Sequence, residues 1–69
     1  MRRWEFRAGL ILLGWGPVEA AIELGTSPGT VMTLEAGEAD DLLGGTTIER
    51  ASAIFERHQL AIQPVTASS

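Results

Sequence analysis

The fold of this 69-residue chain is decided by the stretch Ala20-Ala21-Ile22-Glu23-Leu24-Gly25-Thr26-Ser27-Pro28-Gly29-Thr30-Val31-Met32-Thr33-Leu34-Glu35-Ala36-Gly37. Its small and apolar residues have the spacing that two helices joined by a tight turn require. A small Ala21 lets the two helices approach, and Gly25 supplies the turn between them. Val31 and Leu34, three residues apart, face back into the core. The stretch therefore predicts two short helices that pack together across a turn.

Helix boundaries around this stretch are marked by Gly, Pro, Ser and Thr, and they predict an all-α domain of four helices, with a fifth as an alternative. Pro17 suits the first turn of a helix because its missing NH would be unpaired there anyway. Ser27 can cap the next helix, which begins at Pro28 and which Gly37 terminates. We expect helices at about residues 3–13 and 17–24, from 28 to the Gly37 terminator, and from 46 onward, where Thr46-x-x-Glu49 reads as a capping box.

The apolar residues of the first and fourth helices predict which faces these helices bury. Two neighbouring stripes make much of the first helix apolar, so we expect it to be mostly buried with Arg7 at its edge. The stripes consist of Trp4, Ala8, Ile11 and Leu12, and of Phe6, Leu10 and Leu13. The predicted face of the fourth helix consists of Ile48, Ala51, Ile54, Phe55 and His58. Trp4 and Trp15 are expected to anchor the core or its rim rather than to stack on bases.

Composition excludes several functional classes. The chain has a net charge of -4, no Cys and a single His, so a disulfide scaffold, a Cys-ligated zinc finger and a His-rich metal site are excluded. The acidic loop with Glu38, Asp40 and Asp41 lacks the ligand spacing of a cation site. Ser27 and Thr33 have no His/Asp partner pattern for nucleophilic catalysis, so we expect neither an enzyme nor a cofactor.

The chain is expected to be one cytoplasmic domain that self-associates. No run approaches the 18 or so apolar residues of a membrane span, and interruptions in the amino-terminal apolar run argue against a secretory signal. A chain near this length buries only about 60% of its unfolded surface, which favours dimerisation. In the tail at about 60–69, Leu60 and Ile62 alternate as in a short β-strand. Such a strand would pair with its copy in a second subunit across a twofold axis.

Taken together, these motifs resemble the Cro and phage-repressor (lambda repressor-like) type of helix-turn-helix transcriptional regulator. The resemblance covers roughly residues 7–64. It rests on Leu13-Gly14-Trp15, on Ala20-Ala21-Ile22-Glu23-Leu24-Gly25-Thr26-Ser27, on Thr30-Val31-Met32-Thr33-Leu34-Glu35-Ala36-Gly37, on Thr46-Thr47-Ile48-Glu49-Arg50 and on the tail Leu60-Ala61-Ile62-Gln63-Pro64. The Leu-Glu-x-Gly ending of the third helix and the Thr-capped fourth helix are more specific together than either is alone.

The resemblance implies a single domain over residues 1–69 with a helix-turn-helix at about 17–36. Its third helix would enter the major groove of double-stranded DNA as part of a homodimer, and the mechanism would be binding without chemistry. The groove-facing positions carried over are Ser27, Pro28, Gly29, Thr30, Met32 and Thr33. The amino end of the second helix, at Gly16 and Pro17, would approach a phosphate. An Arg that is usual in the first helix and pairs with the Glu of the third is replaced by Leu10, so Arg7 is expected to pair with Glu35 instead.

Two hypotheses follow for the function. In the first, Met32 with Thr30 or Thr33 reads thymine methyl groups, while phosphates are contacted by Arg2, Arg3 and Arg7. Arg2 and Arg3 would then form an arm, the alternative being a frayed terminus.

The second hypothesis starts from departures from the family. Members commonly present Gln, Arg, Asn or Lys to base edges, whereas this chain has Pro28, Gly29 and Met32 there. Between Gly14 and Gly45 there are six acidic residues and no basic one. This hypothesis is a repressor-like fold that has lost DNA binding and serves as a protein-interaction, dimerisation or antitoxin-like module, whose acidic surface suits a basic partner.

Overall fold

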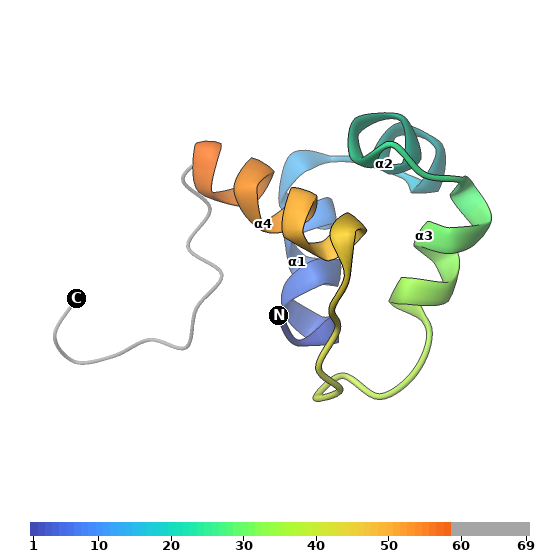
Figure 1. Cartoon of the computed structure of the whole chain (residues 1–69), viewed down its shortest axis with the longest axis vertical. Coiled ribbons are helices and arrows are strands. Elements are labelled where there is room, and N and C mark those ends of the chain that lie inside the picture. The colour runs from blue at the N-terminus through green and yellow to red at the C-terminus, as the bar shows by residue number, and fades with distance from the viewer. Residues whose placement is uncertain (59–69) are drawn as a thin grey trace, which may run out of the picture.

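The computed structural model describes residues 1–58, which form four helices. They are α1 (Arg3–Leu13), α2 (Pro17–Leu24), α3 (Pro28–Glu35) and α4 (Thr46–Arg57). In Figure 1, α4 crosses α1, while α2 and α3 lie together at one side of them. Within residues 1–58 the extended pairing is a single antiparallel bridge between Arg2 and Leu42. The predicted dimer strand with Leu60 and Ile62 lies outside the described residues.

The turn between α2 and α3 has the geometry that its residues predict. Gly25 ends α2 with φ +69°, a left-handed conformation that costs glycine little. The amide of Thr26 donates to the Ala21 carbonyl at 2.9 Å and closes the turn. The next helix is capped by Ser27, whose Oγ accepts from the Thr30 amide at 3.2 Å. Both the predicted Ser27 cap and the placement of Pro28 at the start of α3 are therefore confirmed.

The core lies where the four helices meet. Ala21 is buried and Val31 is fully buried, as predicted, while Leu34 packs against the core from a half-buried position. The remaining buried apolar residues are Phe6, Leu10, Ala20, Leu24, Ile48, Ala51, Ile54 and Phe55. Trp4 and Trp15 pack against this cluster from its rim, which confirms that they anchor the core. At the crossing of α1 and α4 the ring of Phe55 occupies the space that a side chain at position 9 would need.

The prediction that α1 is mostly buried is wrong. Its buried residues are Phe6, Gly9 and Leu10, whereas Ile11 is 77% exposed and Leu12 is 63% exposed. At 3.6 residues per turn, the buried residues lie on one stripe and Ile11 and Leu12 on the opposite side of the helix. Trp4 and Ala8 of the second stripe still pack partly against the core, so that stripe is left at the surface only at its carboxyl end, at Ile11 and Leu12.

Helix α4 begins at Thr46 as expected, but the predicted capping box of Thr46 and Glu49 is wrong. Thr46 is the first helical residue rather than the cap; the cap position is occupied by Gly45, which makes no side-chain bond. The Glu49 amide donates to the Gly45 carbonyl at 3.0 Å, so no capping box forms. The predicted buried face of α4 is confirmed except for His58, which is exposed because it follows the last helical residue.

The end of α3 agrees with the expected glycine terminator. The last helical residue is Glu35, Ala36 is extended, and Gly37 follows with a positive φ of 117°. The chain then runs through the acidic segment to α4, packing Leu43 against the core. In the part of the chain that is described, no helix has the length and apolar character needed to cross a bilayer.

Candidate functional site

The surface of α3 is exposed at every position that the sequence assigns to groove contacts. These positions are Ser27, Pro28, Gly29, Thr30, Met32 and Thr33. Met32 is the largest apolar side chain among them and is 57% exposed. None of the six carries a charge, so this face offers methyl groups, a thioether and hydroxyl oxygens to a partner.

The hydroxyl groups on this face are partly used within the helix. The Oγ1 of Thr33 donates to the Gly29 carbonyl at 3.0 Å, and the Ser27 and Thr30 hydroxyls lie 2.9 Å apart. Each oxygen keeps acceptor capacity, but the Thr33 proton is already donated. The α3 surface therefore suits apolar contacts better than hydrogen-bond donation to bases.

The amino end of α2 is also limited in the donors that it can offer to a phosphate. The Gly16 amide donates to Glu19 Oε1 at 2.8 Å, so this carboxylate already holds the donor that a phosphate would use. Pro17 has no amide proton. A phosphate at this position would have to displace Glu19, which also repels it electrostatically.

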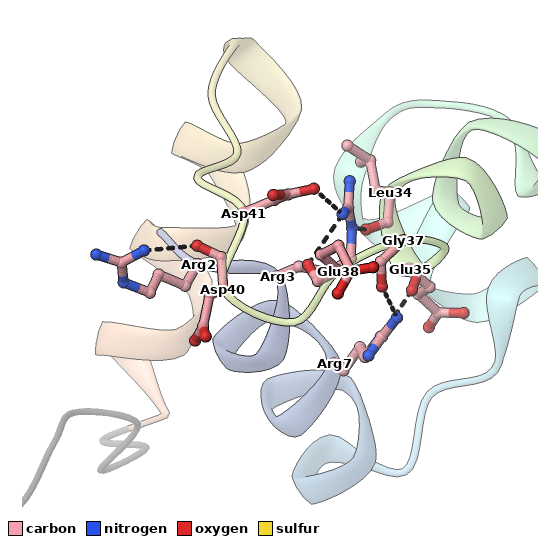
Figure 2. A network of polar contacts seen from close by, with 9 residues as sticks. All are labelled: Arg2, Arg3, Arg7, Leu34, Glu35, Gly37, Glu38, Asp40 and Asp41. Carbon is pink, nitrogen blue, oxygen red and sulfur yellow. Dashed lines mark hydrogen bonds and ion pairs between the residues drawn. The ribbon is translucent and has the colours of Figure 1, made fainter.

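The three arginines that were predicted to contact phosphate all have partners within the molecule (Figure 2). Arg3 donates through Nε to the Leu34 carbonyl at 2.9 Å, and its Nη1 lies 2.9 Å from Asp41 Oδ2. Arg7 donates through Nε to the Glu35 carbonyl at 2.6 Å. Arg2 donates through Nη1 to the Asp40 carbonyl at 2.5 Å. Phosphate contact by these arginines stays a prediction. A phosphate would have to compete with the carbonyl and carboxylate oxygens that the arginines already bind.

The amino terminus is neither a free arm nor a frayed end. The Arg3 amide donates to the Asp41 carbonyl at 2.9 Å, and the Trp4 amide donates to the Ala39 carbonyl at 3.0 Å. The Leu43 amide in turn donates to the Met1 carbonyl at 2.7 Å. The beginning of α1 is thereby bound to the segment between α3 and α4, which satisfies donors that a helix start normally leaves unpaired.

The expected ion pair of Arg7 with Glu35 takes a different form. Arg7 reaches Glu35 through the backbone carbonyl and also donates through Nη2 to the Gly37 carbonyl at 2.9 Å. The Glu35 carbonyl is available because α3 ends there and leaves its last C=O groups without helical partners, and Gly37 follows two residues later. Arg3 and Arg7 stand four residues apart in the sequence, which indicates that both lie on the same side of α1. This spacing does not indicate whether their acceptors are backbone carbonyls or carboxylates.

The remaining surface combines exposed apolar side chains with acidic charge. The large exposed apolar residues among residues 1–58 are Ile11, Leu12, Val18, Ile22, Met32 and Leu42. On α2 the exposed residues Val18 and Ile22 alternate with Glu19 and Glu23. Within the described part of the chain no three His, Asp or Glu side chains gather as metal ligands.

Comparisons with known proteins give no assignment: no family model, no curated protein and no solved structure matches the chain.

Proposed function

We propose that the protein is a small, cytoplasmic, sequence-specific DNA-binding transcriptional regulator of the repressor-like helix-turn-helix type. The observation that carries the proposal is the pairing of α2 and α3 across the Gly25 turn, with Val31 fully buried on one side of α3 and Met32 and Thr33 exposed on the other. A recognition helix needs this division, because one side must be fixed to the domain while the other enters the major groove.

Readout in this proposal depends on apolar contacts. Thr30, Met32 and Thr33 are exposed, and in this proposal Met32 and the threonine methyl groups contact thymine methyl groups, the apolar feature of the major-groove edge. The acidic charge between Gly14 and Gly45 opposes phosphate binding, so affinity is expected to be weak and to fall steeply with salt. A homodimer would compensate by binding two half-sites at once.

The test is an amide-shift titration of labelled protein with a mixed-sequence DNA duplex at roughly 50 mM salt, followed by Thr33→Glu. We expect shifts at residues 26–35 that fade as salt rises, and loss of binding in the variant. Ala53→Glu is the matched control, because it adds the same charge at an exposed position of α4. Equal affinities for both variants and the parent would remove α3 as the reading helix.

The dimer belongs to the same proposal. Its predicted contacts at Leu60 and Ile62 are tested by deleting residues 60–69 and measuring the mass in solution. A dimer that becomes a monomer supports the strand pairing across a twofold axis. A mass that corresponds to the same oligomer before and after the deletion would dismiss it.

A second candidate function is favoured by the charge and apolar exposure of α2. Val18 and Ile22 are exposed beside two glutamates, and no arginine or lysine occurs between Gly14 and Gly45. Such a face suits a basic protein better than DNA, so the alternative is a protein-interaction or antitoxin-like module. The titration distinguishes DNA binding from protein interaction. The alternative would be established if DNA causes no shifts and if a stoichiometric protein partner binds the parent but not a Met32→Asp variant.

A further inference from the structure

We propose that Arg3 and Arg7 are positioning residues for α3, and that they hold the reading helix at a fixed place on α1 instead of contacting DNA phosphates. The inference rests on the proposed function, since it assigns how the recognition helix of that function is held. It is carried by the hydrogen bonds that join α1 to the end of α3 (Figure 2).

At the carboxyl end of α3 the Ala36 amide donates to the Met32 and Thr33 carbonyls, but the carbonyls of Leu34 and Glu35 need other donors. The last carbonyls of a helix have no partners within it, and cationic groups near them are favourable. The last turn of α3 contains no basic residue. Instead, Arg3 donates to the Leu34 carbonyl at 2.9 Å and Arg7 donates to the Glu35 carbonyl at 2.6 Å. Helix α1 thus supplies two guanidinium groups to two successive carbonyls of α3.

Each guanidinium also holds the segment that follows α3. Arg3 Nη1 donates to the Glu38 carbonyl at 3.1 Å and contacts Asp41 Oδ2 at 2.9 Å, while Arg7 Nη2 donates to the Gly37 carbonyl at 2.9 Å. A planar guanidinium with several donors in a fixed arrangement can bond two sites at once, which an ammonium group does less well. The two arginines therefore fix both the end of α3 and the direction in which the chain leaves it.

Burial separates Arg3 from a phosphate-contacting residue. Its side chain is only 12% exposed, and the donors named above are directed at the protein. Moving it to a phosphate would break three contacts and leave the Leu34 carbonyl in a part-buried place without its donor. Arg2, which precedes α1, is by contrast exposed and uses one side-chain donor, so of the three amino-terminal arginines it is the most accessible to a phosphate.

The first measurement is amide hydrogen exchange on the free protein with the charge-conserving variants Arg3→Lys and Arg7→Lys. We expect exchange at residues 34–41 to become faster by at least about tenfold, while amides of α4 keep their protection. Arg57→Lys is the control, because it makes the same change at an exposed position of α4. Exchange that is unchanged at residues 34–41, or accelerated equally throughout the chain, would overturn the positioning role.

The second measurement is DNA affinity as a function of salt, at a temperature where circular dichroism shows each variant to be folded. Arg7→Lys is expected to lower affinity about tenfold and to leave the slope of log affinity against log salt unchanged. Arg2→Gln, which removes a charge from an accessible site, is expected to reduce that slope by about one. Full affinity in Arg7→Lys, or a reduced slope, would overturn the positioning role.

The two measurements separate the failure of this inference from that of the proposed function. If the parent protein binds no duplex, the proposed function fails and hydrogen exchange alone decides whether Arg3 and Arg7 hold α3. If the parent binds DNA while exchange at residues 34–41 does not respond to either Lys variant, the function stands and the positioning role is wrong.

Discussion

The two connections on either side of α3 are held by different means. The short one, residues 25–27, is closed by a bond from the Thr26 amide to the Ala21 carbonyl and by the Ser27 cap. The long one, residues 36–45, is held by arginine side chains of α1: Arg3 reaches the Glu38 carbonyl and the Asp41 carboxylate, and Arg7 reaches the Gly37 carbonyl. The short turn depends mainly on residues within one helical turn of it, whereas the long segment depends on residues near the start of the chain.

This difference predicts how substitutions at each connection will affect the stability of the protein. Backbone conformation and buried apolar contacts at the short turn are insensitive to salt, because they involve little charge. The long segment is held partly by exposed charge, which ions screen. Variants on the two sides of α3 should therefore differ both in the size of their effect on stability and in its dependence on salt.

The largest effect is expected at the end of α2. Leu24 is fully buried, and Leu24→Ala should lower the free energy of unfolding by about 2–5 kcal/mol, because it removes apolar contacts and leaves a cavity. Urea unfolding followed by circular dichroism measures this. Ile22→Ala, on the exposed side of the same helix, should change stability by less than about 0.5 kcal/mol. Equal losses in the two variants would mean that α2 does not pack as described.

A smaller effect is expected at the turn itself. Gly25 and Gly14 both have left-handed conformations, with φ of +69° and +71°. Gly25→Ala and Gly14→Ala should each cost about 1–2 kcal/mol for that conformation. A methyl group at position 25 would also meet the Arg50 guanidinium, which donates to the Leu24 carbonyl at 3.1 Å, whereas position 14 has open space. Gly25→Ala should therefore unfold at lower urea; the reverse order would contradict the Arg50 contact.

The cap of α3 should contribute about as much as one exposed hydrogen bond. Ser27→Ala removes the acceptor of the Thr30 amide and is expected to destabilise the protein by about 1 kcal/mol. Ser27→Asp keeps an acceptor at the cap and should retain most of the stability. Thermal unfolding of the three proteins in parallel measures this, and an Asp variant as unstable as the Ala variant would show that capping is not the cause.

The smallest effect is expected in the long segment. Asp41 is 56% exposed, so Asp41→Asn, which ends its ion pair with Arg3, should cost less than about 1 kcal/mol. The difference should disappear near 1 M salt, where the screening length is only about 3 Å. Asp40→Asn is the control, because Asp40 bonds Arg2 through its backbone carbonyl. A loss that persists at high salt would show that the pair does not act through charge.

Local signals in the sequence predicted the local parts of the fold. The bounds of α1 and α2, the Ser27 cap and the burial of Val31 follow from residues that act on their immediate neighbours. The cap of α4 differs from the prediction, because Thr46 has the residue type of a cap while the preceding Gly45 takes that position in the structure. Residue type alone does not distinguish neighbouring candidates for one cap.

Long-range features were harder to predict. The exposure of Ile11 and Leu12 depends on which side of α1 the other helices cover, and periodicity could not choose between two apolar stripes. At the candidate site, the exposed face of α3 follows from the burial of Val31. The bonds from Arg3 and Arg7 to carbonyls cannot be predicted in this way. Every residue has a carbonyl, and only the folded chain determines which carbonyls lack a partner.

The crossing of α1 and α4 links two positions that are far apart in the sequence. The ring of Phe55 fills the space beside Gly9, so a side chain at position 9 would compete with that ring for one volume. An Ala or Ser at position 9 becomes acceptable only when the residue at position 55 shrinks with it. Among randomised variants of this protein that still fold, the sizes at positions 9 and 55 should therefore vary inversely, as a coupled pair rather than as two independent sites.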